Sequence, residues 1–385
     1  MPNPGPIQGV SASKTAFVGL VERGAVDASS ALTSFVEFEA AYGGAPSLEV
    51  SGVTVPNYMA LAAWAFFENG GQQLYVSRVA AEDGSNNLVP TAADYRNALG
   101  AIEGVKGISI VAAPGSSAAL PTHRDEAAMG GVAAILAELI AHVSQSRYRF
   151  AVLDAPRGFS LTDVEALRGG IDSRDAALYY PWVTMANLLA GKSGEQISVP
   201  PSGFICGIYA RSDAQQGVFK ASTNQPVMAA VGLERAISDD EAKTLNGLGI
   251  NCLRSFHERG ILVWGARTVS SDQEWKYVNV RRYVAYLGHS VDQGTQWVVF
   301  EPNGPPLWAA IKSAIENFLM TEWRHGGLLG IKATDAFFVR CDETTMTQTD
   351  IDNGQVNCVV GVAVLRPAEF VIFRIGWKST ANTHN

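Results

Sequence analysis

Short apolar runs alternate with longer amphipathic segments through the first two-thirds of the chain. The spacing of Leu61, Ala65 and Phe66 predicts a helix over 58–68, which two glycines end, and a second helix is predicted over about 125–143. The apolar runs predict strands at 15–20, 73–79, 108–114 and 149–154. Nearly continuous apolar strands that alternate with helices are typical of a parallel sheet covered on both faces. The first part of the chain is therefore predicted to be an α/β domain.

The pattern changes after residue 237. Ser238 and Glu241 have the spacing of a capping box, in which each side chain bonds a backbone amide at the start of a helix. Two strand-like runs then flank a predicted hairpin turn at 257–260. The predicted elements of this part are strands 250–256 and 261–268, helices at about 276–291 and 307–323, and strands 335–342, 356–365 and 369–377.

Strands joined by short turns beside packed helices predict a smaller α+β domain. The expected organisation is a short N-terminal segment at 1–14, an α/β domain at 15–237 and an α+β domain at 238–385.

Composition narrows the class of protein. The 385 residues are 47% hydrophobic and 17% charged, with a formal net charge of -8. This apolar content excludes disorder, while the charged fraction lies below the roughly 25% of ordinary soluble domains. A surface poor in charge is easily buried against copies of itself. The acidic balance, without a Lys/Arg run, argues against nucleic acid as a partner.

No segment predicts membrane insertion or export. Apolar runs stay shorter than the about 18 residues that a membrane helix needs. The N-terminus has no basic stretch followed by an apolar one, so we do not expect a secretory signal. We expect the protein to be made in the cytoplasm.

Metal and cofactor chemistry is not predicted. Cys206, Cys252, Cys341 and Cys358 are far apart and include no CxxC pair, so we expect buried, reduced thiols. The six histidines show no metal-ligand spacing, and we expect neither a metal nor a cofactor.

Two features could carry chemistry. The run ANLLAGKS at 186–193 has the end of a phosphate-binding loop, but Ala186 replaces its first glycine and no strand is predicted before it. Asp154 ends a predicted strand at the edge where α/β enzymes keep catalytic acids, although a loop-capping role is the commoner alternative. The residues alone predict no catalytic constellation.

Long motifs are spread along nearly the whole chain, and together they resemble contractile phage tail sheath proteins, including the sheaths of phage-tail-like contractile injection systems. The most specific are YYPWV at 179–183, VPPSGFICGIYARSDAQQGVFKAS at 199–222, LNGLGINCLRSFHERGILVWGARTVS at 245–270, EWKYVNVRRY at 274–283, FEPNGPPLW at 300–308, FLMTEWRHGGLLG at 318–330 and RPAEFVIFRI at 366–375.

The resemblance implies a subtilisin-like three-layer α/β outer domain followed by a smaller α+β C-terminal sheath domain that faces an inner tube. It implies stacked hexameric rings, linked by exchanged strands, that contract and drive the tube through a target envelope. The implied partners are copies of the chain itself, the inner tail tube protein, and baseplate and tail terminator or cap proteins, with no nucleic acid and no membrane insertion. Assembly in the bacterial cytoplasm is implied, and phage tail, injection system and bacteriocin stay open as alternatives.

The resemblance also implies two groups of site residues. The candidate intersubunit linking strand is Phe370, Val371, Ile372, Phe373, Arg374 and Ile375. The candidate polar contacts of a tube-facing helix are Lys312, Glu316, Glu322 and Arg324, for which a merely solvated role is the alternative.

A catalytically active subtilisin-like serine hydrolase is the rival function. Aligning the helix that begins at Ser202 with its subtilase counterpart puts the nucleophile position on Val199, which cannot attack a carbonyl, and no triad motif is present.

The N-terminus also departs from the family, because prolines at 2, 4 and 6 make residues 1–8 a poor ladder strand. Three alternatives follow for this chain: subunits are linked through the C-terminal strand alone, the N-terminal strand pairs differently, or contraction itself is altered.

Overall fold

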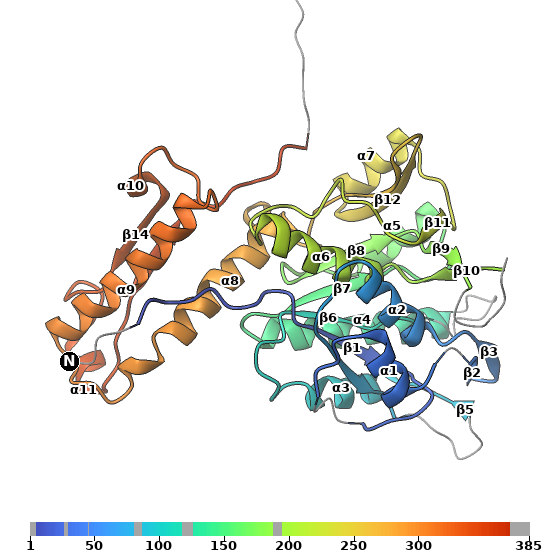
Figure 1. The fold of residues 1–385 in the computed structure, drawn as a ribbon, viewed down its shortest axis with the longest axis horizontal. Helices are drawn as coiled ribbons and strands as arrows, with labels where there is room; N and C mark the ends of the chain where they lie inside the picture. The colour runs from blue at the N-terminus through green and yellow to red at the C-terminus, as the bar shows by residue number, and fades with distance from the viewer. Residues whose placement is uncertain are drawn as a thin grey trace, which may run out of the picture.

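The computed structural model describes residues 5–26, 30–44, 46–80, 87–117, 126–187 and 195–369. Figure 1 shows two parts, which we call the α/β lobe (residues 15–277) and the C-terminal lobe (residues 278–369). The α/β lobe is built on one large sheet, and the C-terminal lobe projects from it as two long helices beside a small sheet.

The large sheet has seven strands in the order β13-β12-β8-β7-β6-β1-β4. All neighbours pair in parallel except β12 and β13, which form an antiparallel hairpin. Every residue of β1, β7 and β8 is buried, which confirms the sheet covered on both faces that the apolar runs predict. The strands are β1 (Thr15–Gly19), β4 (Leu74–Arg78), β6 (Ile110–Ala112), β7 (Phe150–Asp154), β8 (Ala176–Tyr180), β12 (Ile250–Phe256) and β13 (Gly260–Trp264).

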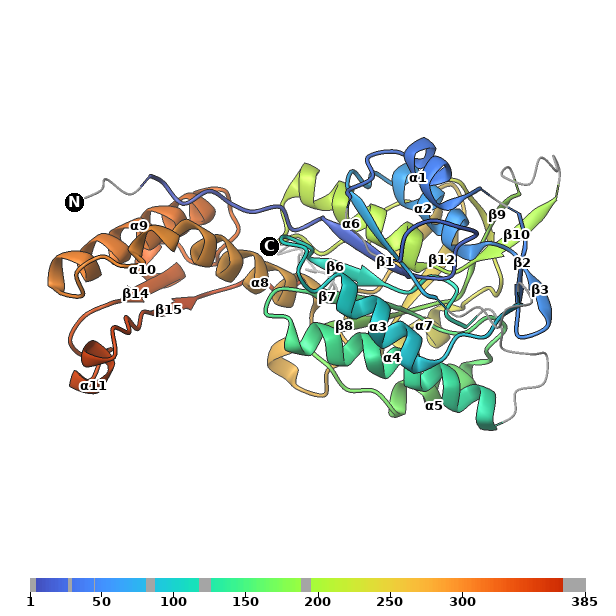
Figure 2. The same cartoon turned by 90° about the horizontal axis from the view of Figure 1, so that it is seen from below.

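Helices cover both faces of this sheet, so the lobe has three layers. Figure 2 shows α1, α2 and α6 on one side, and α3, α4 and α5 on the other. Gly203 and Gly207 let α6 approach α2 closely, because a Cβ at Gly203 would lie 2.6 Å from the carbonyl oxygen of Ala62. The helices of the lobe are α1 (Phe35–Tyr42), α2 (Tyr58–Glu68), α3 (Ala92–Ala101), α4 (Glu126–Gln145), α5 (Leu161–Gly169), α6 (Ser202–Gln216) and α7 (Asp239–Gly247).

Two small sheets lie outside the large one. One contains β2 (Leu48–Val50), β3 (Val53–Val55) and β5 (Asn87–Leu88), and the other contains β9 (Val183–Ala186), β10 (Gln196–Val199) and β11 (Ala230–Leu233). The phosphate-loop candidate falls between β9 and β10, and residues 188–194 lie outside the described residues. A strand does lead into this candidate, contrary to the expectation, but an antiparallel strand follows it where a phosphate-binding loop would open a helix.

The C-terminal lobe is the α+β part. Its elements are α8 (Val278–Gly294), α9 (Pro305–Arg324), α10 (Ala333–Ala336), β14 (Phe337–Arg340), α11 (Gln348–Asp352) and β15 (Val359–Val362), with short 3-10 turns at Gln273–Trp275 and Gln296–Val298. Both predicted long helices are therefore confirmed, and so are two of the three closing strands. The third, 369–377, lies outside the described residues except for Glu369.

The hairpin at 250–264 is confirmed as a hairpin, but the α+β placement expected for it is wrong. It extends the large sheet, because β12 pairs in parallel with β8. The first five residues of β12 are buried, and an apolar strand of this kind is stabilised best inside a covered sheet. A domain division between residues 237 and 238 stays a prediction.

The cysteine expectation is half right. Cys206 and Cys252 are buried free thiols, as predicted. Cys341 and Cys358 instead form a disulfide, with Cα atoms 4.5 Å apart. The reason is the strand register: Arg340 pairs with Val359, which places the residue after β14 opposite the residue before β15.

Among the described residues, no helix combines the length and apolar character needed to cross a membrane.

Candidate assembly site

The small sheet of the C-terminal lobe exposes apolar side chains. β14 and β15 pair only with each other among the named strands, so the sheet keeps outer edges. Its inner face packs on α9 through the buried Val339, while Phe338 and Val359 on the outer face are 49% and 43% exposed. The Phe338 ring lies against Gly361, and the Arg340 guanidinium is 5.3 Å from the centre of that ring. An extended strand could be added at such an edge.

Helix α9 carries the four predicted polar residues, and they do not act alike. Lys312 and Glu316 lie one turn apart with 3.9 Å between their charged atoms, and both side chains are more than two-fifths exposed. Arg324 is exposed in the last turn. Glu322 accepts hydrogen bonds from the hydroxyls of Tyr283 and Tyr286, at 2.9 and 3.0 Å. Lys312 and Glu316 thus lie close together, and Glu322 is hydrogen-bonded to α8.

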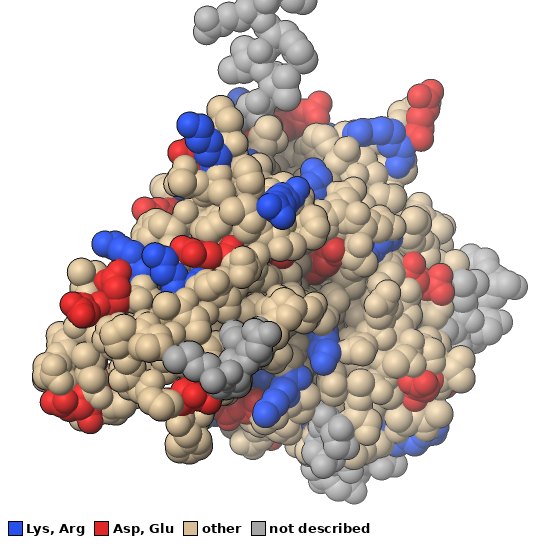
Figure 3. Space-filling view, turned by 60° about the vertical axis from the view of Figure 1, so that its left-hand side comes forward, with Lys and Arg blue, Asp and Glu red and all other residues tan. Residues whose placement is uncertain are grey.

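The face that includes the C-terminal lobe carries charges scattered among many uncharged side chains (Figure 3). No single sign dominates it. The sparse charge of the sequence is therefore visible as a mostly neutral surface, of the kind that can be covered at moderate desolvation cost.

Two adjacent arginines of α8 join the lobes. Arg282 donates to both carboxylate oxygens of Asp213 on α6, at 3.0 and 2.6 Å, and its guanidinium lies 4.5 Å from the Tyr209 ring centre. Burial opposes the charge on Arg282, but the Asp213 carboxylate raises its pKa. Burial also raises the pKa of Asp213, against the opposing charge and hydrogen bonds of Arg282. Arg281 forms a second buried ion pair, with Asp175 just before β8.

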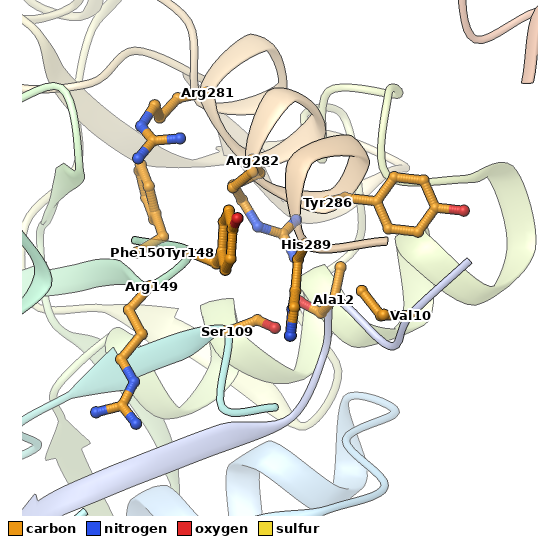
Figure 4. A pocket seen from close by; sticks show the side chains of 11 residues that line it. Val10, Ala12, Ser109, Tyr148, Arg149, Phe150, Arg281, Arg282, Tyr286 and His289 are labelled. Carbon is orange, nitrogen blue, oxygen red and sulfur yellow. The ribbon is translucent and has the colours of Figure 1, made fainter. Parts of the chain in front are cut away.

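The part of the junction around His289 is tightly filled. Figure 4 shows His289 of α8 beside Tyr148 and near Ala12 of the N-terminal segment, while Arg281 points toward Phe150. The His289 and Tyr148 rings stack with centres 4.8 Å apart. A cavity lined by Tyr148, Arg281 and His289 is only about 10 Å³, so it can hold about one water molecule and no larger ligand. A more open hollow of about 520 Å³ lies between α6, α8 and the N-terminal segment.

The N-terminal segment (residues 5–14) lies along α8 of its own chain (Figures 1 and 2). Ile7 is buried against Gly294, and the Val10 amide donates to Ser290 Oγ at 3.1 Å. Arg282 donates to the Ala12 carbonyl at 3.0 Å. Within residues 5–14 no strand forms, which agrees with the prediction of a poor ladder strand at 1–8 for the part that is described.

Asp154 has a capping geometry. Its carboxylate accepts from the Ser202 amide at 2.7 Å and from the Ser202 hydroxyl at 2.5 Å, at the first residue of α6. Pro201 supplies no side-chain cap there, so Asp154 takes that role. Burial raises the pKa of Asp154 to about 7 against the opposing hydrogen bonds.

The same environment leaves no room for a hydrolytic reaction at this point. Ser202 and Val199 are fully buried, and Asp154 is 7% exposed, so a substrate could not reach them. In the described part of the chain, His, Cys, Asp and Glu nowhere gather in a group of three that could hold a metal ion.

The two ion pairs between the lobes were missed by reasoning from the sequence. The one available signal was the Arg281-Arg282 dipeptide on a helix otherwise rich in buried residues, since arginine is rarely buried without a partner. Their partners, Asp175 and Asp213, are 106 and 69 residues away in the chain and had no local signal.

Family models match most of the chain. The model of the phage tail sheath protein central domain matches residues 88–269, and the model of the phage tail sheath C-terminal domain matches residues 270–378. A curated relative, the tail sheath protein of Burkholderia phage BcepMu, is 29% identical over 203 residues. That match covers 48% of this chain and 41% of the relative, so the chain spans less than half the length of the relative.

Solved structures match nearly end to end. The anti-feeding prophage helical sheath in its contracted state has a TM-score of 0.76 and 27% identity, and the match covers 98% of this chain and 96% of that one. A chain of the anti-feeding prophage baseplate has a TM-score of 0.75 and 28% identity, covering 97% and 96%.

Proposed function

The chain belongs to the phage tail sheath protein family, and from this premise we propose that it is a structural subunit of a contractile sheath and not an enzyme. The observation that carries the proposal is the similarity to a contracted helical sheath over 98% of the chain. In this role the protein polymerises around an inner tube as stacked hexameric rings and contracts. The proposed function is assembly and not catalysis. Asp154 and Ser202 are buried, so they offer no nucleophile that a substrate could reach.

The two parts of the chain would have different places in the particle. The α/β part, for which we propose a subtilisin-like arrangement and an outer position, supplies the rigid body. The α+β part would face the tube, with Lys312, Glu316 and Arg324 of α9 as polar contacts. Glu322 would act differently, because two tyrosines of α8 already occupy its oxygens.

Linkage between subunits would use the C-terminal strand. Phe370–Ile375 lie outside the described residues, and we propose that they add to the β14–β15 sheet of a neighbouring copy. The support for this role is the outer edge of that sheet and the exposure of Phe338 and Val359 beside it. Main-chain hydrogen bonds would provide the linkage, and the apolar side chains would cover one another.

Contraction in this scheme is driven by stored assembly free energy. The Arg281–Asp175 and Arg282–Asp213 pairs favour movement of the two lobes as one body, because separating them would leave buried charges unpaired. New contacts between rigid subunits would then replace those of the extended lattice. Besides its own copies, the protein would contact a tube protein, baseplate proteins and a terminator or cap, in a particle assembled in the bacterial cytoplasm.

Electron microscopy of the purified full chain tests the proposal. We expect hollow tubes or stacked rings, and a strictly monomeric protein at high concentration would refute the sheath role.

Two truncations then test the linking strand. Removal of residues 370–385 should abolish tubes while the α/β lobe still unfolds cooperatively, whereas removal of residues 378–385 alone should leave them. Unchanged tubes in the longer truncation would refute the role of the strand.

A further inference from the structure

Glu369, the last described residue, is held by three side chains of the α/β lobe. Its two carboxylate oxygens accept from Arg267 Nε and a terminal nitrogen of Arg267, both at 2.7 Å. Lys276 Nζ lies at 3.2 Å and the Tyr277 hydroxyl at 3.0 Å from the same carboxylate. The side chain of Glu369 is 23% exposed and that of Arg267 is 12% exposed, so the fork lies at the surface and is partly shielded from water. Forked arginine–carboxylate pairs fix direction as well as distance.

The donors are themselves fixed to the large sheet. The Arg267 amide donates to Asn251 Oδ1 at 2.7 Å, and its guanidinium also donates to the Gly247 carbonyl. Asn251 is fully buried on β12 and bonds the carbonyl of Leu178 on β8. A contact with Glu369 is therefore a contact with the framework of the α/β lobe.

The Glu369 carboxylate is ionised near neutral pH. Burial alone would raise the pKa of Glu369, but the hydrogen bonds and charge of Arg267, helped by Tyr277 and Lys276, outweigh it and lower the pKa to about 2. The contact is thus an ionic one near neutral pH.

We propose that Glu369 is a positioning residue that anchors the root of the C-terminal linking segment on the α/β lobe through Arg267, Lys276 and Tyr277. This inference rests on the proposed sheath function, because it assigns the residue that sets where the linking segment leaves its own subunit.

The anchor determines where tension is applied. Without it, a pull on residues 370–375 would pass along residues 366–368 to Leu365, whose carbonyl accepts from Asn279 of α8. It would then reach β15, which belongs to a two-stranded sheet of four-residue strands. With it, the pull passes to Arg267 and then to the hairpin β12–β13 at the edge of the seven-stranded sheet. The proposed linkage would then join one rigid lobe to the next subunit and spare the small sheet that receives the neighbouring strand.

A spin label at residue 368 tests the anchor before any assembly occurs. Ala368→Cys places a thiol on an exposed residue, while both free cysteines of the chain are buried. In this background we compare Glu369→Gln with Glu343→Gln, which makes the same change at an exposed glutamate of the C-terminal lobe. The glutamine keeps the size of the side chain but turns an amide donor toward Arg267.

We expect about a tenfold rise in the mobile label population for Glu369→Gln, as the loss of a charge-assisted hydrogen-bond set predicts, and no change for Glu343→Gln. In the protein that keeps Glu369, label mobility should also rise between low salt and about 1 M salt, and this response should be absent in Glu369→Gln. Equal label mobility in Glu369→Gln and the protein that keeps Glu369 would overturn the anchor.

Electron microscopy of the same variants separates the two proposals. If the unlabelled, unsubstituted chain forms no tubes, the sheath function fails and the label result alone decides the anchor. If it forms tubes, those of Glu369→Gln should be shorter and break more readily under shear. A mobile label in tubes of normal length and strength would overturn the proposed role in linkage.

Discussion

Replacing Asp154 with asparagine should make the protein more stable at alkaline pH, although it alters a fully hydrogen-bonded carboxylate in the core. The pKa of Asp154 rises from 3.8 to about 7 on folding because burial penalises its charged form. The folded state therefore holds the proton more tightly than the unfolded state. Stability must then fall as pH rises between these two values, and the loss is complete above about pH 7.

The size of the effect follows from the same two values. Their difference corresponds to about 4 kcal/mol of unfolding free energy, as an order of magnitude. An asparagine side chain at this position would have no charge to bury, and its oxygen could still accept from the Ser202 amide. The Ser202 hydroxyl can turn from donor to acceptor, so the second contact would also survive.

Urea unfolding followed by tryptophan fluorescence measures this directly. Trp182 is buried beside the site and donates to the Ala155 carbonyl at 2.6 Å, so its emission reports on this region. We expect Asp154→Asn to match the unsubstituted protein near pH 4 and to exceed it near pH 8.

Asp172→Asn is the matched control. Asp172 accepts from the amide and hydroxyl of Ser271 in the same manner, but it is exposed, and these hydrogen bonds lower its pKa. Its substitution should give the opposite trend, with the variant losing relative stability as pH rises through the carboxylate range. A stability difference for Asp154→Asn that does not vary with pH, or one that favours the unsubstituted protein at pH 8, would refute the reasoning.

Further predictions concern the helix contact and the lobe junction. Gly207→Val should destabilise the protein by about 2 kcal/mol or more, because even a Cβ at this position would collide with the Phe66 carbonyl. The control is Gly130→Ala on α4, where a Cβ meets nothing within 4 Å. Thermal unfolding should show this control to be neutral or stabilising. Arg282→Leu should lower the free energy of unfolding in urea by about 3–5 kcal/mol, because it leaves Asp213 buried without its partner. Combining Arg282→Leu with Asp213→Leu should restore much of this free energy.

Each of these has a result that would count against it. Equal unfolding temperatures for Gly207→Val and Gly130→Ala would mean that α2 and α6 are farther apart than described. A double variant at Arg282 and Asp213 no more stable than Arg282→Leu alone would show that the lobes are not held by this ion pair.

Much of the local structure follows from the residue pattern. The helix at Tyr58–Glu68 begins and ends where predicted, and the Ser238–Glu241 capping box forms at the start of α7. Such features depend on neighbours within a few residues, which the sequence displays directly. The long motifs also indicated the family, and the family models cover residues 88–378.

Partners distant in the chain were not predictable in this way. Periodicity tells which side of a segment is buried but not which segment covers it, so the hairpin at 250–264 was assigned to the α+β domain instead of the large sheet. The disulfide of Cys341 and Cys358 depends on the register of two strands, and the expectation of reduced thiols missed it.

The sequence by itself determined many of the elements, the covered parallel sheet and the family of this protein. Only the tertiary structure decided that Arg282 meets Asp213, that the N-terminal segment lies along α8, and that Glu369 is held by Arg267. The physical reason is that an ion pair joins residues by proximity in space. That proximity arises when the sheet order brings together segments that are separated by 69 to 280 residues along the chain.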